Sequence, residues 1–178
     1  MKYESIGDIY SANQRIREEF ENLVSQISEA EAAAVPVGNW SIGHLVEHVA
    51  IVDDGAARIC TKLLAAAKLA GKPSDGSFSL SAGFGENAGK IATAKVEAPA
   101  QVHPTGKVSL ADSLTRINAT TDTIGSMRED LERYALDEHT FPHPFLGDLN
   151  AGEWLVISGL HKRRHASQIQ NLLDKIRE

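Results

Sequence analysis

The sequence predicts an all-α protein, a four-helix bundle with a long loop between its second and third helices. Apolar residues recur at alternating three- and four-residue steps in four separate segments, as expected for helices that each bury one narrow face. Side chains that cap helices precede three of these segments. No segment with strand-like alternation has comparable length, so the four apolar faces are expected to form one core. The 178 residues are enough for a single domain, expected to span residues 1–178.

The first two helices are expected over residues 8–33 and 42–70. The apolar face of the first is formed by Ile9, Ile16, Phe20, Leu23 and Ile27. The apolar face of the second is formed by Ile42, Leu45, Val49, Val52, Ala56, Ile59 and Leu63. Ser41 marks the start of the second helix, because its side chain can accept a hydrogen bond from a free amide of the first turn. Trp40 can pack on Leu45 as a hydrophobic staple.

The third and fourth helices are expected over residues 110–135 and 151–177. The apolar face of the third is formed by Leu114, Ile117, Ile124 and Leu131, and that of the fourth by Trp154, Ile157, Ile169, Leu172 and Ile176. Ser109 can cap the third helix. Asn150 can cap the fourth, with Glu153 at the position that completes a capping box.

The connections between these helices differ in length. Residues 71–108 are rich in Gly, Ser and Pro and are expected to form a long loop. A loop of that length in a compact domain is usually functional or partly disordered. In a bundle it can cross over one end, whereas a short link joins antiparallel neighbours. His103 in this loop and His143 in the last connection, residues 136–149, could contact a site inside the bundle.

Composition narrows the classes of partner. The formal net charge is −6 and the pI is near 5.6, which disfavours a nucleic-acid binder because such proteins normally carry a basic surface. Cys60 is the single cysteine, so an intramolecular disulfide is excluded. No apolar run approaches the roughly 20 residues of a membrane span, and no secretory signal is evident near the first residues. We therefore expect a cytoplasmic protein that acts on a small molecule and binds neither nucleic acid nor membrane.

The histidines are spaced in an unusual way. The seven include three pairs at i and i+4, which are His44 and His48, His139 and His143, and His161 and His165. Random placement at the same frequency would give about 0.3 such pairs. Residues four apart lie one turn apart on the same helix face, with Cβ atoms about 6 Å apart, so two imidazoles can reach one metal ion. Pro142 interrupts the second pair, which is therefore not expected on a regular helix.

His161 and His165 occupy positions where the inward seam of the fourth helix should be apolar. His48 lies three residues after Leu45 and four before Val52, so it too can face inward. Burying polar groups without partners costs about 2 kcal/mol or more each, so these imidazoles need either a hydrogen-bond network or a metal ion. Two interpretations stay open at this point: a metal site formed by His48, His161 and His165, or hydrogen-bonded core histidines without a metal.

Two segments resemble a known family. Residues 40–48 follow the pattern W-S-x-G-x-L-x-x-H, and residues 143–154 follow H-P-x-x-G-x-L-x-x-x-E-W, with H-x-x-x-H after it at His161 and His165. This order resembles the DinB-like superfamily of four-helix-bundle metalloproteins. The resemblance implies a metal triad of His48, His161 and His165, and members of such bundles often form homodimers. The family often has Gln or Glu where this chain has His44, which leaves open whether His44 is a ligand or lines the pocket.

Other polar residues near these positions have less specific interpretations. His44 could contact substrate or support the ligands, or it could be an exposed or capping side chain. Arg164 could flank the site and hold an anion, or form a surface ion pair. Glu47 is rotated about 100° from its neighbour His48, so it is expected in solvent. Lys162 and Arg163 are likewise expected to turn away from the site into solvent.

An open three-histidine metal site is compatible with three alternative functions. Three neutral ligands leave the charge of a divalent ion uncompensated and leave coordination positions for water or substrate, with Zn²⁺ or Ni²⁺ favoured over Fe²⁺ or Mn²⁺. The resemblance implies a thiol-dependent S-transferase, in which a low-molecular-weight thiol attacks an electrophile and Arg164 or His44 holds a carboxylate. A metal-dependent hydrolase of a small substrate is the alternative, although no carboxylate base is evident beside the triad, unlike in H-E-x-x-H peptidases. A third alternative is a non-catalytic metal-binding stress-response protein.

Overall fold

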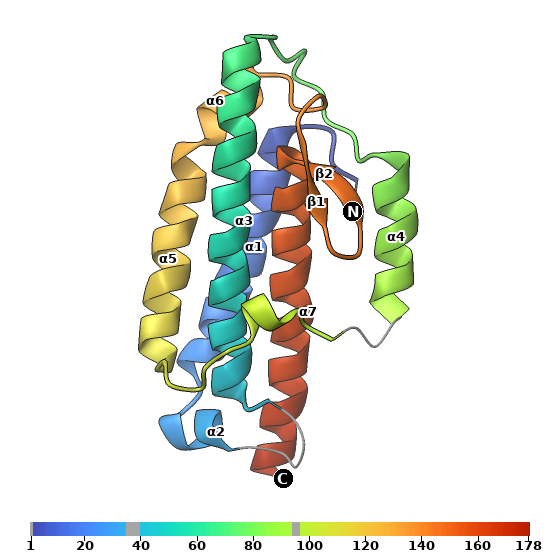
Figure 1. Ribbon diagram of the computed structural model, residues 1–178. Helices are drawn as coiled ribbons and strands as arrows, with labels where there is room; N and C mark the ends of the chain where they lie inside the picture. The colour runs from blue at the N-terminus through green and yellow to red at the C-terminus, as the bar shows by residue number, and fades with distance from the viewer. Residues whose placement is uncertain (1, 35–39, 94–96) are drawn as a thin grey trace.

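The structure is a computed structural model that describes residues 2–34, 40–93 and 97–178. The helices are α1 (Ile6–Ser25), α2 (Glu29–Ala33), α3 (Ile42–Ala70), α4 (Ala82–Thr93), the 3₁₀ turn η1 (Ala100–Val102), α5 (Leu110–Ser126), α6 (Arg128–Arg133) and α7 (Ala151–Arg177). Two short strands, β1 (Thr140–His143) and β2 (Gly147–Asn150), form an antiparallel hairpin. The long helices α1, α3, α5 and α7 lie side by side, with α3 against both α5 and α7 (Figure 1). The predicted four-helix bundle is confirmed.

The two helices that carry the histidines have the predicted bounds. At the start of α3, Ser41 Oγ accepts a hydrogen bond from the His44 amide at 3.2 Å. At the start of α7, Asn150 Oδ1 accepts one from the Glu153 amide at 3.0 Å. Helix α3 ends at Ala70 and is capped by Gly71, whose φ of +68° is the left-handed conformation in which glycine commonly terminates helices. Local capping chemistry therefore determines the ends of the elements that position the site.

The other two predicted helices are each broken in two. The prediction of one helix over residues 8–33 is wrong beyond Ser25, because Ser28 and Glu31 form a capping box of their own and begin α2. The prediction over residues 110–135 is wrong at Met127, whose amide bonds to the Ile124 carbonyl at 3.1 Å in place of the residue four back. A new short helix, α6, starts after it.

The two connections hold more structure than expected. Residues 71–108 contain α4 and η1, and Phe84 of α4 is buried in the core. The chain then crosses α7 and α3 to reach α5, with η1 in contact with α3 (Figure 1). Residues 136–149 contain most of the hairpin, whose second strand begins at Gly147 with a φ of +81°. The long connection between the second and third long helices is therefore partly helical, over the α4 segment.

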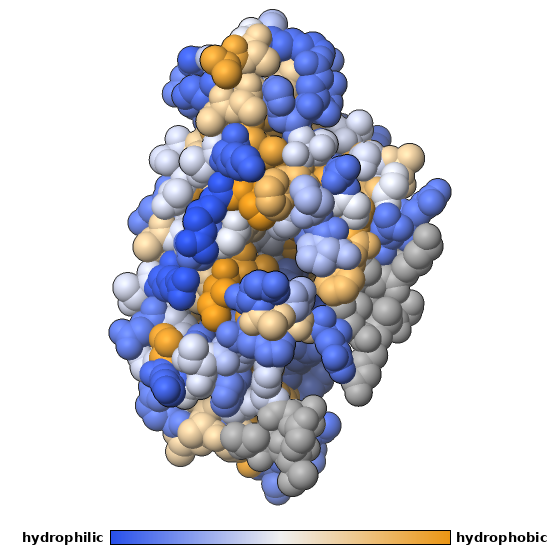
Figure 2. All heavy atoms as spheres, viewed as in Figure 1, coloured by the Kyte–Doolittle hydropathy of each residue, from blue (hydrophilic) through white to orange (hydrophobic). Residues whose placement is uncertain are grey.

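The core consists of two apolar clusters. One contains Ile9 and Leu131 and the other contains Phe20 and Ile169, all with no exposed surface. No helix within the described residues is both long and apolar enough to cross a membrane. The face drawn in Figure 2 is mainly hydrophilic, with small apolar patches between the polar side chains.

A buried polar layer lies between the two clusters along α3 and α7. Asp53 is 2% exposed and accepts hydrogen bonds from Ser158 Oγ at 2.9 Å and from Lys162 Nζ at 2.8 Å. The expectation that Lys162 lies in solvent is wrong, because α7 turns this side chain toward the Asp53 carboxylate on α3. Arg163 is exposed, as expected.

Candidate metal centre

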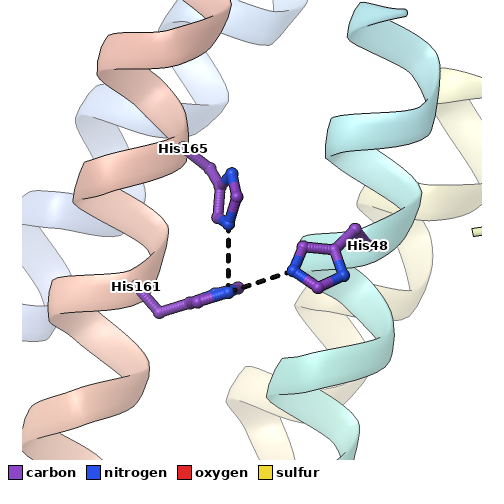
Figure 3. A group of neighbouring side chains, drawn as sticks. All are labelled: His48, His161 and His165. Carbon is purple, nitrogen blue, oxygen red and sulfur yellow. Dashed lines mark hydrogen bonds between the residues drawn. The ribbon is translucent and has the colours of Figure 1, made fainter. Parts of the chain in front are cut away.

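Three imidazoles from two helices meet inside the bundle. His48 comes from α3, and His161 and His165 come from successive turns of α7 (Figure 3). The Nε2 atom of His161 lies 3.1 Å from that of His48 and 3.0 Å from that of His165. One nitrogen from each ring lies within 4.8 Å of the others. The structure thus brings together the three histidines that the sequence singles out.

The tautomer of His48 is defined by its other ring nitrogen. Nδ1 lies 2.7 Å from the Val102 carbonyl oxygen, which can only accept, so Nδ1 carries the proton. A neutral His48 therefore presents a bare lone pair at Nε2. Imidazoles that bind metals commonly donate their second N–H to a carbonyl or carboxylate in this way.

The arrangement of the three Nε2 atoms fits a metal ion better than a hydrogen-bond network. A neutral Nε2 carries either one proton or one lone pair, so His161 cannot satisfy both neighbours through that atom. Tetrahedral zinc with nitrogens at about 2.0–2.1 Å would place ligand atoms about 3.3 Å apart, close to the distances seen. The Nδ1 atom of His161 is buried without a hydrogen-bond partner. A divalent ion would accept all three Nε2 lone pairs at once.

The surroundings keep the cluster neutral at pH 7. Burial lowers the pKa of His161 well below 6.5, and the charges of His165 and His48 lower it further. Burial, with His48 next, lowers the pKa of His165 to about 4. Burial also lowers the pKa of His48. Neutral imidazoles are the form that binds metal, so the site is prepared for a cation without first losing protons.

We expect the metal-free protein to lose stability as the pH falls from about 6.5 to 4. The pKa of His165 is about 4 in the folded protein and about 6.5 in the unfolded chain. The unfolded chain therefore binds more protons between these two pH values. Above pH 6.5 His165 is neutral in both states, so the free energy of unfolding is not reduced by its protonation. By pH 4, protonation of the unfolded chain lowers that free energy by about 3 kcal/mol. Urea denaturation in the presence of a chelator at several pH values measures this loss. Replacing His165 with Ala should make the pH dependence shallower, and an unchanged dependence would contradict the assignment.

Aromatic side chains surround the histidine cluster. The Trp40 ring lies 4.9 Å from the His48 ring and 5.8 Å from that of His103, measured between centroids. Trp40 also packs against the apolar cluster that contains Leu45, and it covers one side of His48. His143 packs on Trp154 at 5.2 Å, and its charge is among those that lower the pKa of His161 after burial and the neighbouring histidines.

Glu47 and His44 lie on α3 close to His48 in the sequence. The expectation that Glu47 lies in solvent is wrong, because it is 3% exposed and bonded to residues 105 and 106 of the connection before α5. His44 is half-buried and caps α3, with Nδ1 2.7 Å from Ser41 Oγ, and it does not belong to the three-nitrogen cluster. No local pattern reveals the burial of Glu47, since its partners follow it by more than 50 residues.

Arg164 is exposed and lies directly before His165 on α7. Its charge lowers the pKa of both His161 and His165, after burial and the neighbouring histidines. Within the described part of the chain, no carboxylate oxygen joins the group formed by the three histidines. The donor set is therefore neutral, and Arg164 is a charged residue whose guanidinium acts on both His161 and His165.

Comparisons with known proteins agree with this architecture. The profile of the DinB superfamily matches residues 12–169. The chain is similar to a solved crystal structure of TT2238, described as a four-helix bundle protein, with 20% identity and a TM-score of 0.63. That similarity covers 94% of this chain and 99% of the other, and it concerns the fold alone. Among curated proteins, none matches the chain.

Proposed function

Since the chain belongs to the DinB superfamily, we propose that it is a divalent-metal-dependent enzyme that transfers a low-molecular-weight thiol to a small electrophile. The observation that carries the proposal is the convergence of three Nε2 atoms, 3.0 and 3.1 Å apart, in an environment that keeps them neutral. His48, His161 and His165 would hold the ion. Zn²⁺ or Ni²⁺ suits three imidazoles best.

A divalent ion at this site would lower the pKa of a bound thiol or water and so supply a nucleophile near neutral pH. The side chains of the protein prepare the site in two ways. The Val102 carbonyl holds the ring of His48 so that Nε2 faces the cluster. Trp40 covers His48 on one side and keeps water from that side of the ring.

Arg164 is the residue that we assign to substrate binding. Its guanidinium is exposed and its charge acts on both His161 and His165. A guanidinium binds a carboxylate through two parallel hydrogen bonds, which orients the bound molecule as well as attracting it. His44, the other candidate, already bonds Ser41 at the helix start, so Arg164 is the better anchor for an anionic group.

A metal-dependent hydrolase is the second candidate. The same neutral donor set suits the activation of water. A hydrolase also needs a general base, and among the described residues no carboxylate joins the three-histidine group. Thiol transfer requires no such base once the thiol is ionised, and therefore ranks first.

The test is metal-dependent turnover with defined thiols. Apoprotein loaded with Zn²⁺, Ni²⁺, Fe²⁺ or Mn²⁺ is assayed with glutathione, bacillithiol or mycothiol analogues and a chlorinated aromatic electrophile. We expect turnover that requires both metal and thiol and is lost in His48→Ala. Arg164→Gln should raise the KM for a carboxylate-bearing thiol about tenfold, the effect of one lost charge-assisted hydrogen bond, with metal content unchanged.

Arg163→Gln is the control for this charge change, because Arg163 is exposed and one position further from His165. It should leave KM unchanged. Metal-dependent release of acid from esters or amides without any thiol would favour the hydrolase. Absence of metal-dependent turnover across all thiols would contradict the proposal.

A further inference from the structure

Two adjacent residues of α3 hold the connection that leads to α5. His48 donates its Nδ1–H to the Val102 carbonyl at 2.7 Å. Glu47 accepts three hydrogen bonds from the next residues of the same segment, from the Thr105 amide at 2.9 Å, the Thr105 hydroxyl at 2.8 Å and the Gly106 amide at 2.8 Å. Residues 102–106, here called the strap, therefore lie against the helix that supplies one of the three imidazoles.

The attachment through Glu47 is specific. Its side chain is 3% exposed, and both carboxylate oxygens are used, Oε1 by Thr105 and Oε2 by Gly106. Charge-assisted hydrogen bonds of this kind are about twice as strong as neutral ones. If the strap detached, the carboxylate would lose these donors. As long as the carboxylate is buried it needs these donors, because a buried charge without partners is costly, so Glu47 favours the attached strap.

The close approach of Gly106 gives the strap a second contact with α3. Gly106 has a φ of +70°, and a β-carbon built at this position would overlap Nε2 of His44. Any larger residue at position 106 would have to move the strap or His44. The strap thus contacts α3 at two successive turns, at His44 and at the adjacent residues Glu47 and His48.

We propose that Glu47 is a positioning residue of the metal centre, acting through the strap on the Val102 carbonyl that orients His48. Val102 is three residues from Thr105, so the place of its carbonyl depends on the anchor at Glu47. Without that carbonyl, the ring of His48 is free to turn and to move its proton to Nε2, which removes the lone pair. This inference rests on the metal-binding part of the proposed function.

Metal binding and attachment of the strap should each favour the other. Partners of metal-ligating histidines raise metal affinity by fixing the ring and its tautomer. By thermodynamic linkage, a metal ion that binds better when the strap is attached must also stabilise the attached strap by the same factor. Metal binding should therefore slow hydrogen exchange at the strap amides, although these lie outside the ligand set.

The experiment is a Zn²⁺ titration of the full chain against a competing chelator. Glu47→Gln should weaken Zn²⁺ binding about 10- to 100-fold, the usual cost of losing a partner of a ligand. In the wild type, Zn²⁺ should slow exchange at residues 102–106, and Glu47→Gln should abolish this slowing. The absorption bands of bound Co²⁺ should also shift in Glu47→Gln, a readout that a general loss of stability does not move.

Glu153→Gln is the matched control. Glu153 is 1% exposed and, like Glu47, accepts hydrogen bonds from backbone amides. These come from Ser81 at 2.8 Å and from Asn150 at 3.1 Å. It is a buried carboxylate on α7, and within the described part of the chain its hydrogen bonds reach neither the strap nor the histidines. Its replacement should lower stability and leave Zn²⁺ affinity within about twofold of wild type, well below the range expected for a ligand partner.

Two further variants keep the inference testable if Glu47→Gln does not fold. Thr105→Val removes one hydrogen bond to Glu47 and keeps the backbone donor, so it should weaken Zn²⁺ binding less than Glu47→Gln. Gly106→Ala should displace the strap through the overlap with His44, and should weaken Zn²⁺ binding as well. Unchanged affinity in Glu47→Gln, or in Gly106→Ala, would overturn the inference and leave the proposed function standing. A wild-type protein that binds no Zn²⁺ or other divalent ion would overturn both.

Discussion

Replacing His161 with Ala is expected to abolish stoichiometric metal binding. Its Nε2 lies within 3.1 Å of both other Nε2 atoms, so it is the central member of the cluster. Zinc sites with four protein ligands contribute about 10–16 kcal/mol, so each ligand accounts for about 3 kcal/mol or more. Losing one of three ligands should weaken binding by at least about two orders of magnitude. Elemental analysis of the purified variant and the shift in Tm on adding Zn²⁺ both measure this loss.

The fold of this variant should persist. The Nδ1 atom of His161 is buried without a partner, so removal of the ring also removes an unfavourable group and partly offsets the lost packing. His139→Ala is the control, because His139 lies outside the cluster in the segment before β1. It should keep full metal content. Stoichiometric metal in His161→Ala would remove His161 from the ligand set.

The largest expected effect on folding comes from Asp53. Replacing it with Ala should lower the free energy of unfolding by about 3–5 kcal/mol, because Lys162 would be left as a buried charge without its partner. Lys162 Nζ lies 2.8 Å from Asp53, and their side chains are 10% and 3% exposed. Ser158 would lose its acceptor at the same time. Equilibrium urea denaturation at pH 7 measures the change.

Two further variants test whether loss of the buried Asp53–Lys162 ion pair causes this destabilisation. Asp54, the next residue, forms ion pairs with Arg58 and Arg116 at the surface, and Asp54→Ala should cost less than about 1 kcal/mol. The double replacement Asp53→Leu with Lys162→Met should recover most of the lost stability, because apolar groups of similar size can replace a buried ion pair. A double variant no more stable than Asp53→Ala would contradict this explanation.

Much of the frame of the site can be predicted from the sequence. The bounds of α3 and α7 follow from their apolar period and from the caps at Ser41 and Asn150, which are interactions within one turn of helix. The spacing of His161 and His165 places both imidazoles on one helix face for the same local reason. The breaks after Ser25 and at Met127 do not follow from the apolar period, although the capping box of Ser28 and Glu31 is a local signal of the first of them.

The helical class, the helices that carry the histidines and the three imidazoles that could share one ion can all be read from the amino-acid sequence, because each depends on residues a few positions apart or on a motif. Which polar residues are buried, and which groups they bond, depends on the tertiary fold. Glu47 meets Thr105 and Asp53 meets Lys162 across separations of 58 and more than 100 residues. No periodic pattern encodes such a pair. Burial depends on which segment of chain returns to cover a helix face, and that is a property of the packed fold.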